Sequence, residues 1–111
     1  VVMGLGHALM EDYIEETGFT KTPGFAKYIL PTTLDIPKIT SIIVEEPDPK
    51  TPLGVKGIGE PAMVQTAPAI INAIYDAVGV RMTQLPATPE RVLAALMAKK
   101  GQRERAQPKA A

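Results

Sequence analysis

The chain contains no cysteine and a single histidine. Without thiols it forms no disulfide, no thiolate zinc site and no cysteine-ligated iron–sulfur cluster. One histidine likewise excludes a metal site built from several imidazoles. If this protein takes part in redox chemistry, the electron carriers must therefore be bound by other chains or domains.

Aromatic side chains are also scarce, at 5% of the sequence. No apolar run approaches the ~20 residues that a transmembrane helix needs, and no signal peptide is recognisable. We therefore expect a cytoplasmic location and no membrane partner.

The formal net charge is zero, but the basic residues gather at the C-terminus. Residues 99–111 hold five basic groups and one acidic group, which leaves seven basic and eleven acidic groups in residues 1–98. A basic cluster can indicate a nucleic-acid partner, but this one has no aromatic residue and ends in Gln-Pro-Lys-Ala-Ala. We interpret residues 99–111 as a disordered, solvated tail with no nucleic-acid partner.

The most informative positive feature is a glycine-rich run over residues 54–61, which reads Gly-Val-Lys-Gly-Ile-Gly-Glu-Pro. Glycine lets a ligand approach the backbone closely and permits a positive φ. Pro61 suits the first turn of a helix and restricts the residue before it. The run therefore predicts a constrained loop that places Glu60 just before a helix, beside the backbone N–H groups of Gly57, Ile58 and Gly59.

Two other interpretations of this loop were weighed. Gly57, Gly59 and Ala62 have the spacing that begins a dinucleotide fingerprint, but that fingerprint must follow a buried apolar strand. The preceding residues 47–56 are rich in proline and charge, which argues against it. In the other interpretation, the glycines only turn the chain and Glu60 is an exposed cap on the next helix.

Short elements separated by prolines indicate an α+β fold with about three helices and two or three short strands. The hydrophobic periodicity predicts helices at residues 2–17, with Gly18 as a cap, at 61–79, with a start, break or kink at Pro68, and at 89–100. The best strand is predicted at residues 39–46, an extended piece at 25–30, and a strand or connector at 80–85.

The last helix has the clearest boundary signals. Thr88 is predicted as the N-cap, Pro89 as the first helical residue and Gly101 as the end. On the first helix, His7 is expected to pair with Glu11, four residues on, rather than to act in catalysis.

Four blocks of the sequence, in the same order, resemble the molybdenum-binding subunits of xanthine dehydrogenases and aldehyde oxidoreductases. Gly57-Ile58-Gly59-Glu60 resembles the family's Gly-x-Gly-Glu signature. Residues 67–74 resemble the helix that follows it, and residues 85–92 its Pro-x-Thr-Pro-Glu-Arg segment. Gly4 lies in a block, residues 4–9, that resembles its Gln-Gly-x-Gly-x-Ala-Leu helix, although Met3 stands where many members have Gln.

The resemblance implies that residues 1–98 are the C-terminal segment of a larger molybdopterin-binding domain, not active alone. It implies hydroxylation of an N-heterocycle, such as a purine, or of an aldehyde, with water as the oxygen source. Glu60 is then the general base, and Gly57, Ile58, Gly59 and Gly4 contact the molybdopterin. The molybdenum is held through the pterin and takes no ligand from this chain.

The implied partners are the remainder of the molybdenum subunit, iron–sulfur (2Fe–2S) and FAD subunits or domains, and a small-molecule substrate. The alternative from another class is a non-catalytic structural or assembly segment whose glycine loop only turns the chain.

Overall fold

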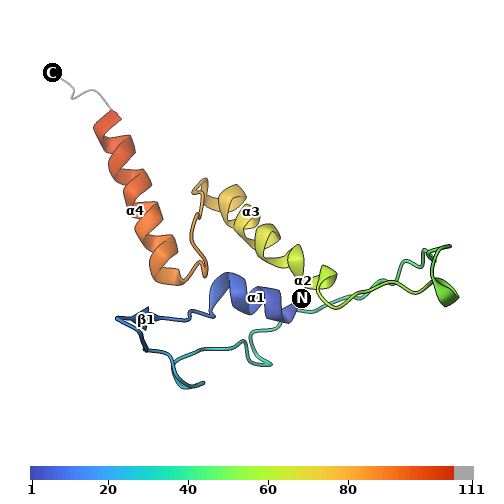
Figure 1. The fold of residues 1–111 in the computed structure, drawn as a ribbon. Coiled ribbons are helices and arrows are strands. Elements are labelled where there is room, and N and C mark those ends of the chain that lie inside the picture. Colours follow the sequence, from blue (N-terminus) through green and yellow to red (C-terminus); the bar gives the residue numbers. More distant parts are fainter. Residues whose placement is uncertain (107–111) are drawn as a thin grey trace.

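The computed structural model describes residues 1–106, apart from the side chains of two residues near the end of the last helix. The two strands pair antiparallel, Glu15 with Thr20 and Glu16 with Phe19. In chain order the elements are α1 (Val2–Leu9), β1 (Glu15–Glu16), β2 (Phe19–Thr20), the 3-10 helix η1 (Pro52–Gly54), α2 (Pro61–Val64), α3 (Thr66–Val78) and α4 (Pro89–Ala106) (Figure 1). Three longer helices and a small sheet confirm the predicted α+β class.

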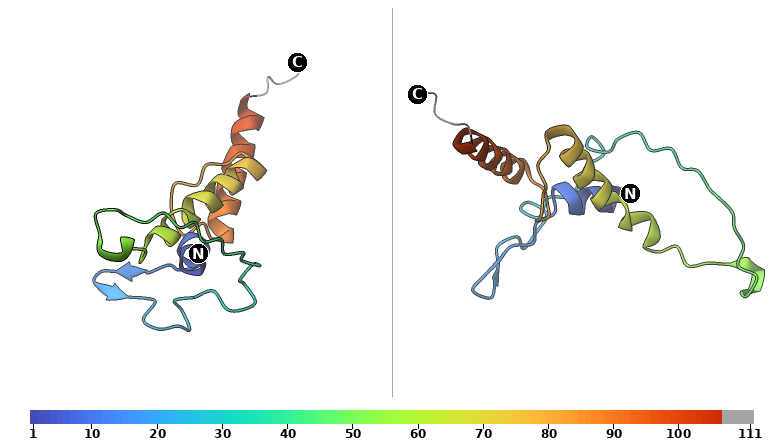
Figure 2. Two further views of the ribbon diagram at one scale, coloured as in Figure 1. Left: turned by 90° about the vertical axis from the view of Figure 1, so that its right-hand side faces the viewer. Right: turned by 90° about the horizontal axis from the view of Figure 1, so that it is seen from above.

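The elements spread out rather than enclose a core. The radius of gyration is 19.9 Å, against ~13 Å for a compact domain of this length, and the molecule measures 75 × 38 × 29 Å. In the described part of the chain, the buried hydrophobic residues are Ala8, Val80 and Ala87. The fold is therefore held by a few specific contacts, and the two views of Figure 2 show α1 lying beside α2 and α3.

The closest contact between helices occurs where α1 crosses the junction of α2 and α3. The buried residues of α1 are Gly4, Gly6 and Ala8, and Gly4 lies on the side that meets the other helices. A Cβ added at Gly4 would lie 2.6 Å from the Thr66 Cβ and 3.1 Å from the Met63 carbonyl oxygen. Glycine is needed at Gly4 because only a bare Cα fits that separation.

Polar contacts tie α4 and the residues just before it to α1 and to the chain that follows α1. The Ala87 N–H donates to the Ala8 carbonyl at 2.6 Å, in the last turn of α1. The Arg91 guanidinium donates to the Asp12 carboxylate and to the Pro86 carbonyl, both at 2.8 Å. Since the Arg91 and Asp12 side chains are 28% and 30% exposed, this ion pair is better sheltered than a surface pair.

A lysine on α4 caps the C-terminus of α3. Gly79 ends α3 with φ 62°, a left-handed conformation that favours glycine. The Lys99 ammonium donates to the carbonyls of Val78 and Gly79 at 2.7 and 2.9 Å. A cation suits this position because the helix dipole is negative at its C-terminus.

The first helix is shorter than predicted. It ends at Leu9 rather than at Thr17, and the chain then forms the β1–β2 hairpin. Thr17 and Gly18 both have positive φ, 50° and 81°, as a tight two-residue hairpin turn requires. Gly18 is thus a turn residue and not a helix cap, because the hairpin takes the residues that would have extended the helix.

The predicted strand at residues 39–46 is also absent. Residues 36–48 are irregular. No other segment of the described chain pairs with residues 39–46 as a strand. Residues 25–30 form a turn instead of an extended piece, with the Tyr28 N–H donating to the Gly24 carbonyl at 2.8 Å. The segment 80–85 is a connector.

The second predicted helix is broken three residues earlier than expected. The break falls at Gln65, between α2 and α3, so Pro68 lies in the first turn of α3. Proline is tolerated there because the first helical N–H groups have no partner within the helix.

The last helix begins as predicted and ends later. It runs from Pro89 through Gly101 to Ala106, so the predicted end at Gly101 is wrong. Residues 99–106 of the segment that we interpreted as a tail are therefore helical, and residues 107–111 lie outside the described part. Local propensity explains the continuation, since Gln, Arg and Glu after Gly101 are good helix formers.

Thr88 gives the first testable prediction. Its Oγ1 accepts a hydrogen bond from the Arg91 N–H at 3.4 Å, so Thr88→Ala should destabilise the start of α4 by roughly 0.5–2 kcal/mol, and the long bond favours the low end. Hydrogen exchange of the first amides of α4 should accelerate accordingly. Thr83→Ala, in the connector, is the matched control. Unchanged exchange in the Thr88 variant would show that this threonine is not the cap.

Candidate functional site

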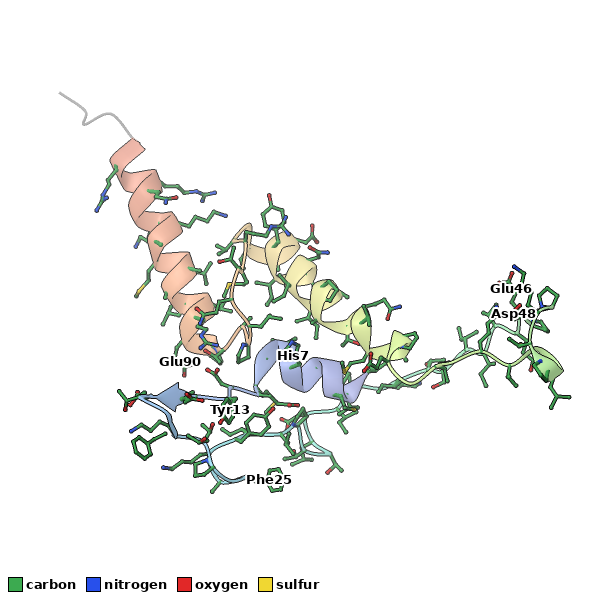
Figure 3. The ribbon with its side chains drawn as sticks, viewed as in Figure 1. His7, Tyr13, Phe25, Glu46, Asp48 and Glu90 are labelled. Carbon is green, nitrogen blue, oxygen red and sulfur yellow. The ribbon has the colours of Figure 1, made fainter. Side chains whose placement is uncertain are left out.

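The glycine loop runs back from a protruding tip to α2. The tip closes on itself, because the Asp48 N–H donates to the Gly54 carbonyl at 3.1 Å and the Thr51 hydroxyl donates to the Val55 carbonyl at 2.9 Å. Figure 3 shows the tip, with Glu46 and Asp48 labelled, far from the other helices. Leu53 at its end has φ 58° and is 99% exposed.

Glu60 stands immediately before α2, as predicted. Its carbonyl accepts the Met63 N–H at 2.8 Å, and its φ and ψ are −112° and −26°. Its side chain makes no capping hydrogen bond and is exposed. Within residues 1–106 the carboxylate has no hydrogen-bond or ion-pair partner, so the interpretation of Glu60 as a side-chain cap gains no support from this geometry.

The glycines of the loop have two different settings. Gly54 has the expected positive φ, as do Gly18 and Gly79 elsewhere in the described residues, whereas Gly57 and Gly59 do not. A Cβ added at Gly57 or Gly59 would meet no atom within 4 Å. Neither backbone conformation nor packing within the described residues therefore requires glycine at these two positions.

The backbone donors of the loop are free as well. In the described part of the chain, the N–H groups of Gly57, Ile58 and Gly59 have no hydrogen-bond partner. The Ile58 side chain is 77% exposed. The loop thus offers three donors and open space on one side of a free carboxylate.

Gly4, the fourth predicted cofactor contact, has a different setting. It lies against Met63 and Thr66, so α1 meets the loop through the helix that follows Glu60. Thr66 occupies the space beside its Cα, which explains the glycine by packing. Met3 next to it is 73% exposed.

The expected pairing of His7 with Glu11 is wrong. The Glu11 carboxylate accepts a hydrogen bond from the Tyr28 hydroxyl at 2.7 Å, because the segment after the hairpin folds back beneath α1 (Figure 1). His7 is exposed and faces α3 in Figure 3.

Shifted pKa values occur where local hydrogen bonds explain them. The bond to Glu11 raises the pKa of Tyr28. The hydroxyl and N–H of Thr32 lower the pKa of Asp35. The pKa of Glu90 is lowered by its own N–H and by Thr88. None of these shifts singles out a catalytic group, since each has a local structural cause.

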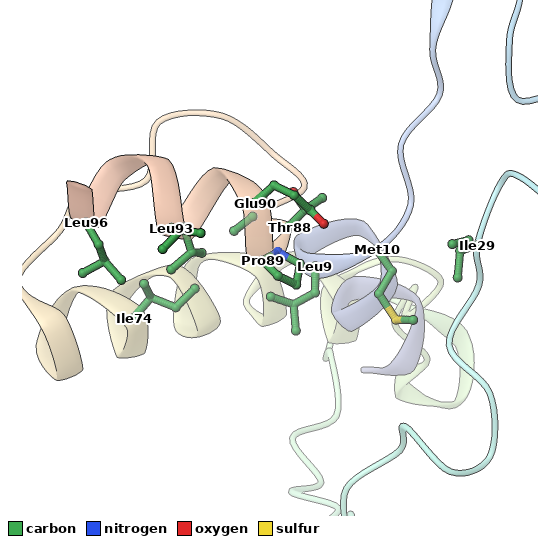
Figure 4. Close-up of a pocket in the computed structure, with 11 residues that line it drawn as sticks. Leu9, Met10, Ile29, Ile74, Thr88, Pro89, Glu90, Leu93 and Leu96 are labelled. Carbon is green, nitrogen blue, oxygen red and sulfur yellow. The ribbon is translucent and has the colours of Figure 1, made fainter. Parts of the chain in front are cut away.

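A large groove lies elsewhere, between α3, α4 and the end of α1, and has a volume of about 720 Å³ (Figure 4). Its lining is mostly apolar, with Ile74 facing Leu93 and Leu96. Glu60 and the glycine loop take no part in it. The sequence analysis missed this groove, although the spacing of Val92, Leu93 and Leu96 on α4 indicated an apolar stripe there.

Metal ligands are not concentrated anywhere in the described residues. Among residues 1–106 no three side chains of His, Cys, Asp or Glu come close enough to hold a metal ion. A search of the same residues for membrane-spanning helices finds none that is sufficiently long and apolar.

No protein-family model matches the chain, but individual proteins do. It is 39% identical over 92 residues to the xanthine dehydrogenase molybdenum-binding subunit of Escherichia coli O157:H7, a match that covers 81% of this chain and 12% of that protein. It is 41% identical over 102 residues to the aldehyde oxidoreductase of Megalodesulfovibrio gigas, covering 88% and 11%. The chain thus spans about one eighth of the length of these relatives.

A solved structure gives the same result as these sequence relatives. The crystal structure of quinoline 2-oxidoreductase from Pseudomonas putida 86 superposes with a TM-score of 0.75 at 33% identity, and covers 86% of this chain and 13% of the other. The sequence and the fold therefore support the same conclusion, although neither tests the role of any single residue. This chain belongs to the family of molybdenum-binding subunits found in xanthine dehydrogenases and aldehyde oxidoreductases.

Proposed function

We propose that this chain supplies the general base and part of the cofactor-binding loop of a molybdenum hydroxylase. The enzyme hydroxylates an N-heterocycle, purine-like in size, or an aldehyde, and takes its oxygen atom from water. One observation supports this most directly: Gly57 and Gly59 are glycines that the chain's own fold does not need, beside a carboxylate that it leaves unpaired.

The loop residues fit a molybdopterin. Open space at both glycines lets a ligand approach the backbone, and the free N–H groups of Gly57, Ile58 and Gly59 suit its oxygen atoms. Gly4 would support the same pocket through its contact with α2. When bound, the cofactor supplies two-electron oxidation of the substrate carbon, and its molybdenum is held through the pterin, so this chain needs no metal ligand.

Glu60 would act on a proton. Its carboxylate accepts the proton of the attacking hydroxyl group that derives from water, which makes the oxygen a better nucleophile. Pro61 restricts the backbone of Glu60, while its side chain stays free to reach the substrate.

The active enzyme needs more than this chain. The relatives named above are about eight times longer than the matched segment, so the remainder of the molybdenum subunit would complete the cofactor pocket and bind the substrate. Iron–sulfur (2Fe–2S) and FAD subunits would then carry the electrons away. We place the assembled enzyme in the cytoplasm.

A deletion tests this function against the structural alternative. Removing residues 57–60 from the assembled enzyme should abolish molybdenum loading and turnover together. If molybdenum content and turnover both stay normal after the deletion, the glycine loop only turns the chain, and the segment is structural.

The behaviour of the chain without its partners gives a further prediction. The isolated 111-residue chain should show no hydroxylase turnover and no tight binding of molybdopterin, because Glu60 and the glycine loop lie open to solvent. Titration with molybdopterin, followed by metal analysis after gel filtration, measures this. Stoichiometric cofactor retained by the isolated chain would contradict it.

A further inference from the structure

Residues 39–46, here named the isoleucine segment, are the most exposed apolar stretch of the structure. Ile42, Ile43 and Val44 are 82%, 85% and 85% exposed. Between residues 36 and 47 no backbone or side-chain hydrogen bond connects the chain to any other described residue. Both the apolar side chains and the backbone groups of the segment therefore lack partners.

The composition of this segment favours a strand. Isoleucine and valine are enriched in strands because their branched side chains pack well on a pleated surface. Successive side chains of a strand point to opposite faces, so Ile42 and Val44 would share one face and Ile39 and Ile43 the other. Apolar residues on both faces are typical of a strand buried between two layers.

The rest of residues 1–106 does not provide the missing strand. The tip closes through its own hydrogen bonds at Asp48 and Thr51. Beyond it, the isoleucine segment and the returning residues 55–60 follow separate paths, as the right-hand view of Figure 2 shows. The partner must therefore come from another part of a larger assembly.

We propose that the isoleucine segment adds as a strand to the edge of a β-sheet in the remainder of the molybdenum-binding subunit. That remainder is the chosen partner because the matched segment covers only 11–13% of the related chains, which leaves ample sequence to build a sheet. Main-chain hydrogen bonds to a sheet edge would satisfy the free backbone groups.

A second copy of this chain is a poorer partner. Two isoleucine segments would form a two-stranded ribbon, which is marginal in water. Such a ribbon would also leave both apolar faces without a covering layer, since the described residues place no helix or strand over the segment.

Pairing of the isoleucine segment with this sheet would also contribute to the proposed function. The choice of the molybdenum-binding subunit as the partner rests on that proposed function. The isoleucine segment leads into the tip, and the glycine loop leads from the tip back to α2 (Figure 1). A strand anchored in the neighbouring sheet would hold the tip, and through it the backbone that leads to Glu60.

Hydrogen–deuterium exchange tests the proposal on the assembled molybdenum-binding subunit and on the 111-residue chain alone. The amides of residues 39–46 should exchange at least about 100-fold more slowly in the assembled subunit than in the isolated chain. Equally fast exchange in both would overturn the proposal. So would slow exchange in the isolated chain together with a concentration-dependent dimer, which would show pairing between copies.

Two substitutions at one position provide matched variants. Ile43→Val keeps the branched side chain and the N–H, and should retain the protection. Ile43→Pro removes the N–H and should reduce the protection of the remaining amides in the segment at least tenfold. Protection that survives Ile43→Pro would contradict strand pairing at this position, and assembly lost in this variant alone would support it.

Molybdenum analysis of the same samples separates this inference from the proposed function. A molybdenum-loaded subunit with unprotected residues 39–46 would refute the strand and leave the function intact. A protected segment in a subunit that neither loads molybdenum nor turns over would refute the function and leave the strand intact.

Discussion

Replacing Glu60 with Gln is expected to lower turnover of the assembled enzyme by about 10²–10⁴-fold, the range typical of a lost general base, while molybdenum content stays near normal. Glutamine keeps the shape of the side chain and removes its basicity. Because the carboxylate makes no contact within the described residues, the substitution should not disturb the fold. Steady-state kinetics checks the fall in turnover, and molybdenum content per protomer, measured on the same preparation, checks that cofactor loading is unchanged.

Glu15→Gln is the matched control, since Glu15 lies exposed in the hairpin on β1. It should leave turnover and metal content unchanged. Full metal and near-normal turnover in the Glu60→Gln enzyme would show that Glu60 has no chemical task.

Gly59→Val is expected to lower cofactor loading along with the rate. A Cβ at Gly59 meets nothing in this chain, so its branched side chain should barely affect the stability of the chain itself. It would instead intrude on the ligand, and overpacking of ~1–3 kcal/mol corresponds to a loss of roughly 5-fold to 150-fold in binding. Molybdenum per protomer and turnover should therefore fall together, unlike in Glu60→Gln.

Gly24→Val is the control for this substitution, because Gly24 also has open space around it and lies before the turn at Tyr28. It should leave molybdenum content intact. Equal molybdenum content in the Gly59→Val and Gly24→Val enzymes would mean that no ligand approaches the loop at Gly59.

The sequence predicted the elements that local chemistry determines. The start of α4 depends on Thr88 and Pro89, and the end of α3 on Gly79, and each of these residues acts on its immediate neighbours. The length of α1 and the state of residues 39–46 depend on partners far away in the sequence or outside the chain. Periodicity alone could not show that a hairpin ends the first helix, or that the best strand has nothing to pair with here.

The candidate site was predicted in position but not in every detail. Glu60 lies before a helix that begins at Pro61, because proline and the glycines act locally. The glycines were expected both to let a ligand approach the backbone and to permit a positive φ. Gly57 and Gly59 have the open space but not the positive φ, which in this loop occurs at Gly54. Gly4 was expected to face the cofactor, and its contact with Thr66 could not be foreseen because it joins residues 62 positions apart.

The scarcity of buried side chains determines how this chain should behave when it is handled alone. In the described part, the buried hydrophobic residues are Ala8, Val80 and Ala87. Much of the free energy that stabilises the folded chain must therefore come from contacts with the partner surface that covers it. Its apparent melting temperature should then rise with the concentration of that partner, by mass action, with ~2.7 kcal/mol gained at a hundredfold excess over the dissociation constant. Unassembled copies should be cut readily by proteases, and the amount of this chain that survives in a cell should follow the supply of its partner.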